Sequence, residues 1–254
     1  MPLMKLEGEI IISSATVVGT FAGLAVTMPV GRYFLNTIGS GGATRTFLSE
    51  LKNQLDTVTG RTWTISVDDG TDTSLGKVTI SQNGAATTGT WTSTSIRDLL
   101  GFTINLASGV TWTGTNHAKY LFLPNCGRSG IMAPEASDGA IEADYTLAVA
   151  TDGTPYALSY SKRYLDSLEF RTLLGSKTWN SVGVTTNEAL EQFYSDVISQ
   201  GLRIRFHADR SVDATFRTWV VENGYEFKPQ PVREDWANGA ASLFSIRYTV
   251  RKTT

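Results

Sequence analysis

Two histidines are the residues of this 254-residue chain that most readily suggest chemistry, because imidazole serves in both acid–base catalysis and metal binding. His207 and Asp209, in the segment HADRSVD, could share one face of a strand and form a His–Asp pair. The chain has no Gly-x-Ser-x-Gly elbow to supply a nucleophile. With His117 as the second histidine, we expect no metal site built on two or three histidines. The single cysteine, Cys126, excludes an internal disulfide, and its segment LPNCGRSG favours a loop residue over a catalytic thiol.

A cluster of carboxylates lies near the middle of the chain, at Glu135, Asp138, Glu142 and Asp144. Two such groups could carry acid–base catalysis, as in a hydrolase. A solvated acidic loop is the commoner origin of a cluster like this, and the sequence leaves both interpretations open.

Two glycine-containing segments resemble ion sites. DDGTD (68–72) crowds carboxylates around a glycine, but no Glu follows at the calcium-loop distance, and Asp-Gly favours a hairpin turn. GSGGATR (39–45) could cradle a phosphate, but it lacks the following Lys-Ser/Thr pair. A connector with a helix cap at Ser40 or Thr44 fits it better. We therefore expect no catalytic residue, no cofactor and no metal site, and hence no enzyme.

The composition indicates a folded protein that is light in charge, with 41% apolar residues, 18% charged residues and a formal charge of −2. No cluster of Lys and Arg suggests sequence-specific nucleic-acid binding. The uncharged run from Ile10 to Gly31 contains many Ser, Thr and Gly, so we expect strands or an extended arm and no membrane span. Glu7 and Glu9 precede it where a signal peptide requires positive charge. The chain is expected to be soluble and made in the cytoplasm.

Apolar residues at helical spacing predict three helices, at 43–58, 95–100 and 186–200. Gly60 and Gly201 follow the first and the last as terminators. The apolar stripes are Phe47, Leu48, Leu51, Leu55 and Val58 in the first helix, and Leu190, Phe193, Val197 and Ile198 in the last.

Capping boxes are expected at two of these helices. Ser95 with Asp98, and Thr185 with Glu188, have the spacing at which two side chains satisfy free backbone N–H groups at a helix start.

Alternation of apolar and polar residues predicts strands at TWTISV (62–67), LRIRFH (202–207) and FSIRYTVR (244–251). One buried and one solvent-exposed face is typical of antiparallel sheets. The expected fold class is α+β and β-dominated, with antiparallel sheets in sandwich-like halves and two main amphipathic helices.

The chain is expected to divide into an N-terminal half, 1–128, and a C-terminal half, 129–254, because the segment between 125 and 140 is rich in Pro, Gly and Asp. Residues 43–81 and 186–221 repeat the order helix, glycine, strand, turn, strand. The repeated order indicates either an internal duplication or ordinary α+β architecture that occurs twice in the chain.

Candidate subunit-interface residues come from two regions. The outward phases of the strands 202–207 and 244–251 carry arginines, which require carboxylates in the same chain, such as Glu222 or Glu226, or in another subunit. The uncharged run contributes apolar residues. The candidates are Arg203, Arg205, Arg247, Arg251, Ile10, Ile12, Val17 and Phe21.

Aromatic residues could instead form a carbohydrate-binding face. The strand pattern places Trp63, Trp91 and Trp219 inward, so we expect them in the core.

Residues 61–125 carry a resemblance. TWTISVDD, GKVTIS, TWTSTSIRDLLGFT and KYLFLPN, in this order, resemble virion structural proteins of tailed bacteriophages. YSKRYLDSLEFRTLL and SLFSIRYTVR are similar to strands of tail-ring subunits, of the distal tail or tail tube type.

The resemblance implies a non-enzymatic protein that self-assembles into a ring around the DNA channel, with the phage tail as its location after synthesis in the bacterial cytoplasm. Its partners would be copies of itself and other tail or neck proteins. A carbohydrate- or receptor-binding module of the tail tip, or a head–tail connector, are the alternatives.

Overall fold

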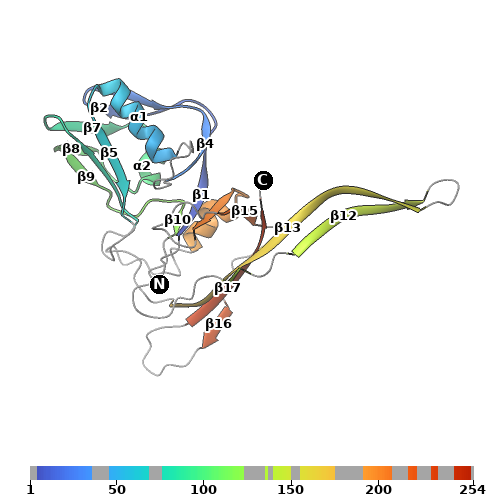
Figure 1. Cartoon of the computed structure of the whole chain (residues 1–254). Helices are drawn as coiled ribbons and strands as arrows, with labels where there is room; N and C mark the ends of the chain where they lie inside the picture. Colours follow the sequence, from blue (N-terminus) through green and yellow to red (C-terminus); the bar gives the residue numbers. More distant parts are fainter. Residues whose placement is uncertain are drawn as a thin grey trace.

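The computed structural model describes residues 5–35, 46–68, 76–122, 135–136, 140–149, 155–174, 191–207, 217–221, 230–233 and 243–252. The fold is β-dominated, with antiparallel sheets and few helices, as predicted. Two parts are distinguished in Figure 1: a compact body that contains the N-terminal strands and helices, and a long ribbon that projects from it.

Two antiparallel sheets build the body. One has the order β3-β2-β7-β8, from Leu24–Met28, Thr16–Phe21, Thr87–Trp91 and Leu106–Gly109. The other has the order β5-β6-β9, from Trp63–Val67, Val78–Gln82 and Thr111–Thr113. The sheets share one core, since the Phe21 ring meets the Trp63 ring edge-on at 6.2 Å between centroids. Trp63, Val78 and Ile80 are fully buried, which confirms the predicted inward position of Trp63.

Helix α1, Phe47–Thr59, packs against β3 and β5. Its predicted stripe is confirmed, because Phe47, Leu48, Leu51 and Leu55 are buried and Val58 packs against the core. The predicted start at residue 43 is wrong. Thr46 is extended and caps the helix in a reciprocal box with Ser49, so the helix begins at Phe47. Gly60 ends the helix in the left-handed region, as expected. Ser40 and Thr44 lie outside the described residues.

Helix α2, Thr94–Leu99, is the short helix predicted at 95–100. Its cap is Ser93, whose hydroxyl accepts from the Ile96 N–H, and the predicted capping box of Ser95 with Asp98 is wrong. Asp98 instead forms an ion pair with the neighbouring Arg97.

The third predicted helix is described from residue 191 onward and ends in a π-helical turn, η1, Tyr194–Ile198. Phe193, Val197 and Ile198 are buried, as their stripe predicted. Gly201 follows at φ 65°. Leu190, Thr185 and Glu188 lie outside the described residues.

The largest sheet joins both halves of the chain in the order β10-β1-β14-β15-β17-β13-β11. These strands are Leu121–Phe122, Lys5–Ile12, Ile204–His207, Arg217–Val221, Leu243–Lys252, Pro155–Leu174 and Glu135–Ala136. β16, Gln230–Arg233, pairs with β17, and β4, Gly31–Phe34, pairs with the second half of β1. The N-terminal strand therefore belongs to a sheet made mostly by the C-terminal half.

The predicted repeat of element order is present in the backbone. α1, Gly60 and the β5–β6 pair are followed later by η1, Gly201 and the β14–β15 pair. The two strand pairs belong to different sheets. Their common order of elements fits both an internal duplication and ordinary α+β architecture that occurs twice.

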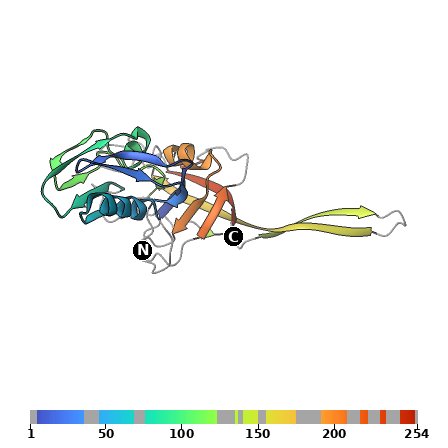
Figure 2. The same cartoon turned by 90° about the horizontal axis from the view of Figure 1, so that it is seen from above.

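The ribbon is an antiparallel pair of β12, Ala140–Val149, and β13. β13 has 20 residues, which corresponds to a length of roughly 65 Å at ~3.3 Å per residue. Its C-terminal half pairs with β17, from Leu165 onward, and anchors the ribbon in the large sheet. Both views show the other half extending away from the body (Figures 1 and 2).

Candidate functional site

Arginines were predicted at the outward-facing positions of the strands 202–207 and 244–251. These two strands are not neighbours in the sheet. β14, which carries Arg205 and directly follows Arg203, is separated from β17 by β15. On β17, Arg251 is opposite Val220 of β15, and Arg247 is opposite Glu169 of β13. The side chains of Arg247, Arg251 and Trp219 lie outside the described part of the structure, as do Glu222 and Glu226.

β1 supplies the carboxylates that face the β14 arginines. Lys5 is opposite His207 and Glu7 is opposite Arg205 in the antiparallel register. Arg203 donates from Nε to Glu9 Oε1 at 2.9 Å, and Arg32 Nε lies 3.5 Å from the same oxygen. The partners therefore come from the same chain, nearly 200 residues away in sequence.

Lys5, Glu7, Arg205 and His207 form a buried charged cluster, which we call the charge seam. It is not the solvent-exposed face predicted for LRIRFH. Lys5, Glu7 and His207 are 0% exposed, and Arg205 is 7% exposed. Lys5 Nζ lies 3.1 Å from Glu7 Oε1, and His207 Nε2 lies 3.4 Å from Glu7 Oε2. The Arg205 guanidinium stacks over the Phe34 ring at 4.0 Å. The prediction was wrong because alternation along LRIRFH shows only which side chains are polar. Whether the polar face of the strand is buried depends on the elements that cover it.

The electrostatics of the seam suit a structural role. Burial would raise the pKa of Glu7, but the bond to His207 and the charges of Lys5 and His207 outweigh it and lower that pKa. Glu7 therefore stays ionised. Removing one member of such a group leaves other buried charges uncompensated, which costs about 3–5 kcal/mol.

The predicted apolar interface residues are mostly core residues. Ile10, Ile12 and Phe21 are 4%, 9% and 0% exposed, and only Val17, at 43%, lies on the surface. The run from Ile10 to Gly31 folds into strands, from the end of β1 through β2 and β3 to the start of β4, and each of these strands contributes buried residues.

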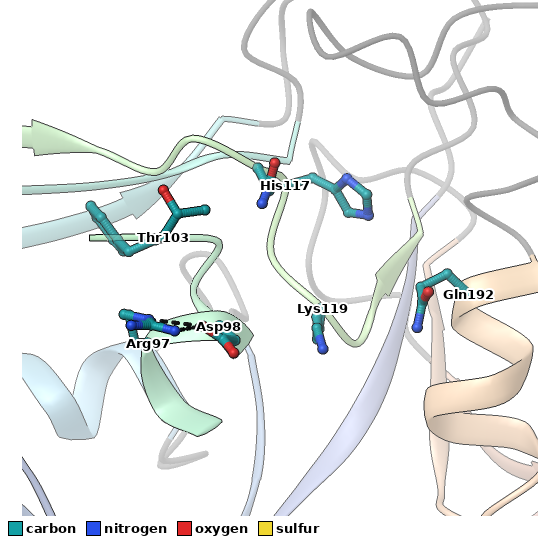
Figure 3. A pocket seen from close by; sticks show the side chains of 8 residues that line it. Arg97, Asp98, Thr103, His117, Lys119 and Gln192 are labelled. Atoms are coloured by element: carbon teal, nitrogen blue, oxygen red, sulfur yellow. Dashed lines mark hydrogen bonds and ion pairs between the residues drawn. The ribbon is translucent and has the colours of Figure 1, made fainter. Parts of the chain in front are cut away.

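A pocket of ≈ 390 Å³ lies where the loop before β10 meets the helical segment at Gln192 (Figure 3). Most of the residues that line it have polar side chains, which are two cations, one carboxylate and four neutral groups. The residues are Arg97, Asp98, Phe102, Thr103, Asn116, His117, Lys119 and Gln192. The sequence reasoning missed this site, and the only sequence signal for it is the cluster of polar residues in TNHAKY after the short helix.

Backbone hydrogen bonds fix the pocket walls. The N–H of Lys119 donates to the Leu99 carbonyl at 2.8 Å, and the N–H of Asn116 donates to the Gly101 carbonyl at 2.9 Å. Gly101 has φ 79°, and a Cβ there would lie 2.2 Å from the Asn116 carbonyl oxygen, so only glycine fits. The backbone from which the Lys119 side chain extends is thus bonded to the end of α2.

Charges in the pocket are unevenly compensated. Arg97 is paired with Asp98 at 2.7 Å, whereas Lys119 has no ion pair among the described residues. Burial lowers the pKa of His117 to about 4, against the opposing charge of Asp196, so this imidazole is neutral at physiological pH. The lining thus contains two cations and one carboxylate, and the carboxylate of Asp196 acts on His117 from outside the lining.

The other candidate sites can be located only in part. His207 contacts Glu7, and its proposed partner Asp209 lies outside the described residues. The DDGTD segment follows β5, whose antiparallel pairing with β6 confirms a hairpin, but residues 69–75 lie outside the description, as do residues 39–45 and Cys126.

The central carboxylates can be placed only by their strands. Glu135 is on β11 and Glu142 and Asp144 are on β12 of the ribbon, whereas Asp138 lies outside the described residues.

The body surface is unusual in lacking charge on its strands. None of β2, β3, β5, β6, β7, β8 and β9 contains Asp, Glu, Lys or Arg. Their exposed positions are mainly Thr and Ser, such as Thr64, Ser66, Thr88 and Thr90. In the described part of the body, the exposed large apolar residues are all aliphatic, and Trp63 and Trp91 are buried as predicted.

The ribbon has unpaired edges. Among the described strands, β12 pairs with β13 alone, and β13 from Pro155 to Tyr164 pairs with β12 alone. Unpaired backbone N–H and C=O groups along a strand can accept another strand.

A scan against protein-family models, a search of curated proteins and a search of solved structures each returned no significant match. In the described portion, no helix is long and apolar enough to cross a membrane. The described residues also contain no group of three or more His, Cys, Asp or Glu that could hold a metal ion.

Proposed function

We propose that this chain is a non-enzymatic structural subunit of a tailed-phage virion, a tail component that assembles with copies of itself into a ring around the DNA channel. The observation that carries the proposal is the β12–β13 ribbon, which extends from the body (Figure 1) and whose two edges pair with no other described strand.

A free ribbon of this kind is poorly suited to a protein that works as a monomer. Isolated two-stranded ribbons are marginally stable in water, and long exposed edges promote association. Contact with a second copy removes both costs. Because the ribbon and the body are different surfaces, each copy can bind one neighbour and be bound by another, and such head-to-tail contacts close into rings when the rotation permits.

The uncharged strands of the body support the same proposal. Burying Thr, Ser and aliphatic side chains against a neighbour requires no desolvation of ionised groups, which is the largest cost of burying surface. The segments that resemble phage virion proteins include β5, β6 and the β7–α2 connection, which build this uncharged body.

The solution mass of the purified chain tests self-assembly. Light scattering after gel filtration should give a multiple of 27.6 kDa, and negative-stain images of that peak should show closed rings or stacked tubes. Stacked tubes would favour a tube protein, and single rings would favour the tail tip or the neck. A monomer at the highest attainable concentration would contradict self-assembly and favour the receptor-binding alternative.

The position in the virion requires a separate test. Antibodies raised against the purified chain should label the tails of virions in electron micrographs, and labelling of the capsid alone would contradict a tail role.

A further inference from the structure

The ribbon of β12 and β13 has two free edges of matching length. β12 has 10 residues, and Pro155–Tyr164 is the half of the 20-residue β13 that pairs with β12 alone among the described strands. β17 pairs with β13 only from Leu165 onward. Each edge therefore offers a row of backbone N–H and C=O groups to a further strand.

The outer part of the ribbon lacks the charged residues with which natural proteins protect a free edge. Tyr145–Val149 and Pro155–Ser161 contain no Asp, Glu, Lys or Arg. The bulge in the ribbon lies between Asp144 and Tyr145, so Tyr145–Val149 and Pro155–Ser159 pair in an unbroken register. The charged residues of the ribbon all lie nearer the large sheet, at Glu142, Asp144, Lys162 and Arg163.

The edges of the two body sheets are poorer partners for another strand. Two of their edge strands, β3 and β5, pack against α1. The other two, β8 and β9, have only 4 and 3 residues, and the indole N–H of Trp112 donates to the Ala107 carbonyl of β8 at 2.7 Å. The ribbon therefore carries the longest free edges in the described structure.

The two edges of the ribbon are complementary in direction, because β12 and β13 are antiparallel. A rotation axis that runs along the ribbons keeps β12 of every copy pointing the same way. β12 of one copy is then antiparallel to β13 of the next, so that pairing of these edges continues the hydrogen-bond pattern of the ribbon itself.

We propose that the free edge of β12 in one copy, at Tyr145–Val149, pairs antiparallel with the free edge of β13 in the next copy, at Pro155–Ser159. This inference rests on the proposed self-assembly and refines its head-to-tail contact, since the two edges of the ribbon are themselves different surfaces. Pairing of β12 with β12 stops at a dimer, whereas pairing of β12 with β13 leaves one free edge at each end until a ring closes. It also makes each two-stranded ribbon part of a wider sheet.

Disulfide formation between two single-cysteine variants tests the pairing. Cys126→Ser first removes the one native thiol. In this background, Ala148→Cys places a thiol on β12, and a second set of chains carries one cysteine on β13, at Tyr156, Ala157, Leu158 or Ser159 in turn. A short tag on the β12 variant lets the mass of each covalent dimer identify its two chains.

We expect a mixed disulfide between Ala148→Cys and at least one of the β13 variants when the two are mixed, assembled and oxidised. Ala148→Cys alone should give none, because the β12 strands of neighbouring copies are then separated by β13. Their spacing of about 9–10 Å exceeds the limit of about 7 Å between the Cα atoms of a disulfide. Thr64→Cys, on an exposed position of β5, replaces the β13 cysteine as the matched control and should give no mixed disulfide.

Circular dichroism and light scattering establish that each variant folds and that each mixture assembles. Assembled mixtures without a mixed disulfide at any of the four β13 positions would overturn this pairing while the proposed self-assembly stands. Disulfide dimers of Ala148→Cys alone would also overturn it, because they would show that β12 meets β12. A wild-type chain that is monomeric at every concentration would overturn both.

Discussion

The body and the ribbon differ in how their strands are covered by other elements and paired at their edges. In the body, two sheets and α1 enclose the rings of Phe21, Trp63 and Trp91, and Phe21 meets Trp91 edge-on at 5.2 Å. The ribbon has no second layer among the described residues and leaves both edges unpaired. We expect the body to carry the stability of the monomer, and under the proposed self-assembly the ribbon carries the association between copies. Changes in each part should therefore affect different measurements.

Shortening the ribbon should have the largest effect on assembly. Ile141 and Tyr164 are register partners, so residues 142–163 can be replaced by Asn-Gly, which favours the tight turn of a hairpin. We expect a monomer in light scattering, with the melting temperature of the body unchanged.

The control for this deletion keeps the ribbon and changes only its tip. Val149 and Pro155 are also register partners, and joining them through Asn-Gly should leave assembly intact. Full-size assemblies from the shortened chain would contradict the role given to the ribbon.

Glu7→Gln should produce the largest loss of stability. The substitution leaves Lys5 and His207 beside a neutral amide in a fully buried site, and we expect the free energy of unfolding to fall by about 3–5 kcal/mol. Chemical denaturation measures this change. Glu191→Gln removes the same charge from an exposed position and should change stability by at most about 0.5 kcal/mol. Equal effects of the two substitutions would show that the seam does not depend on its charges.

Gly8→Ala should cost less, about 1–3 kcal/mol. A Cβ at this position would lie 2.3 Å from Val197 Cγ2, so that η1 would have to move away from β1. Combining it with Val197→Ala makes room for the new methyl group. The double variant should therefore lose less stability than the sum of the two single variants, and strict additivity would contradict direct contact between the two residues.

The pH dependence should be the most gradual effect, because it is spread over more than two pH units, and should come from the body. The pKa of His117 is lowered to about 4, so between pH 6.5 and 4 the unfolded chain binds a proton that the folded chain does not. Stability should then fall with decreasing pH by at most about 1.4 kcal/mol per pH unit. His117→Asn should flatten this slope in denaturant titrations at several pH values. An unchanged slope would assign it to other groups.

Glu7 acts in a lower range of pH. Because its pKa is lowered by His207 and Lys5 against the effect of burial, its contribution is complete above the ordinary glutamate pKa and is lost as the pH falls through the lower folded value.

Local chemistry made much of the body predictable. Alternation placed Trp63 and Val67 inward, helical spacing gave the buried stripe of α1, and Gly60 marked its end. The exact cap of α2 was less predictable, because Ser93 and Ser95 are both good cap residues. Which of them caps the helix depends on the path of the backbone between β7 and α2.

Long-range partners were the part that the sequence could not predict. Nothing local in KLEGEIII indicates that its glutamates meet Arg203 and Arg205, because the register that pairs them joins opposite ends of the chain. The pocket at Lys119 was missed for the same reason, since its lining comes from α2, a loop and a distant helical segment. No strand was predicted at β12, whose Glu142 and Asp144 were assigned to an acidic cluster, and the strand-like sequence within β13 was named only through the resemblance.

Hydrogen exchange of the ribbon amides tests the central claim most directly. The intact chain would be compared at a dilution that gives monomers and at a concentration that gives assemblies. We expect the amides of β12 and of Tyr156–Tyr164 to exchange rapidly in the monomer and much more slowly in the assembly, while those of β5 and β6 are protected in both. Equal exchange of the ribbon in the two states would contradict its completion by a second copy.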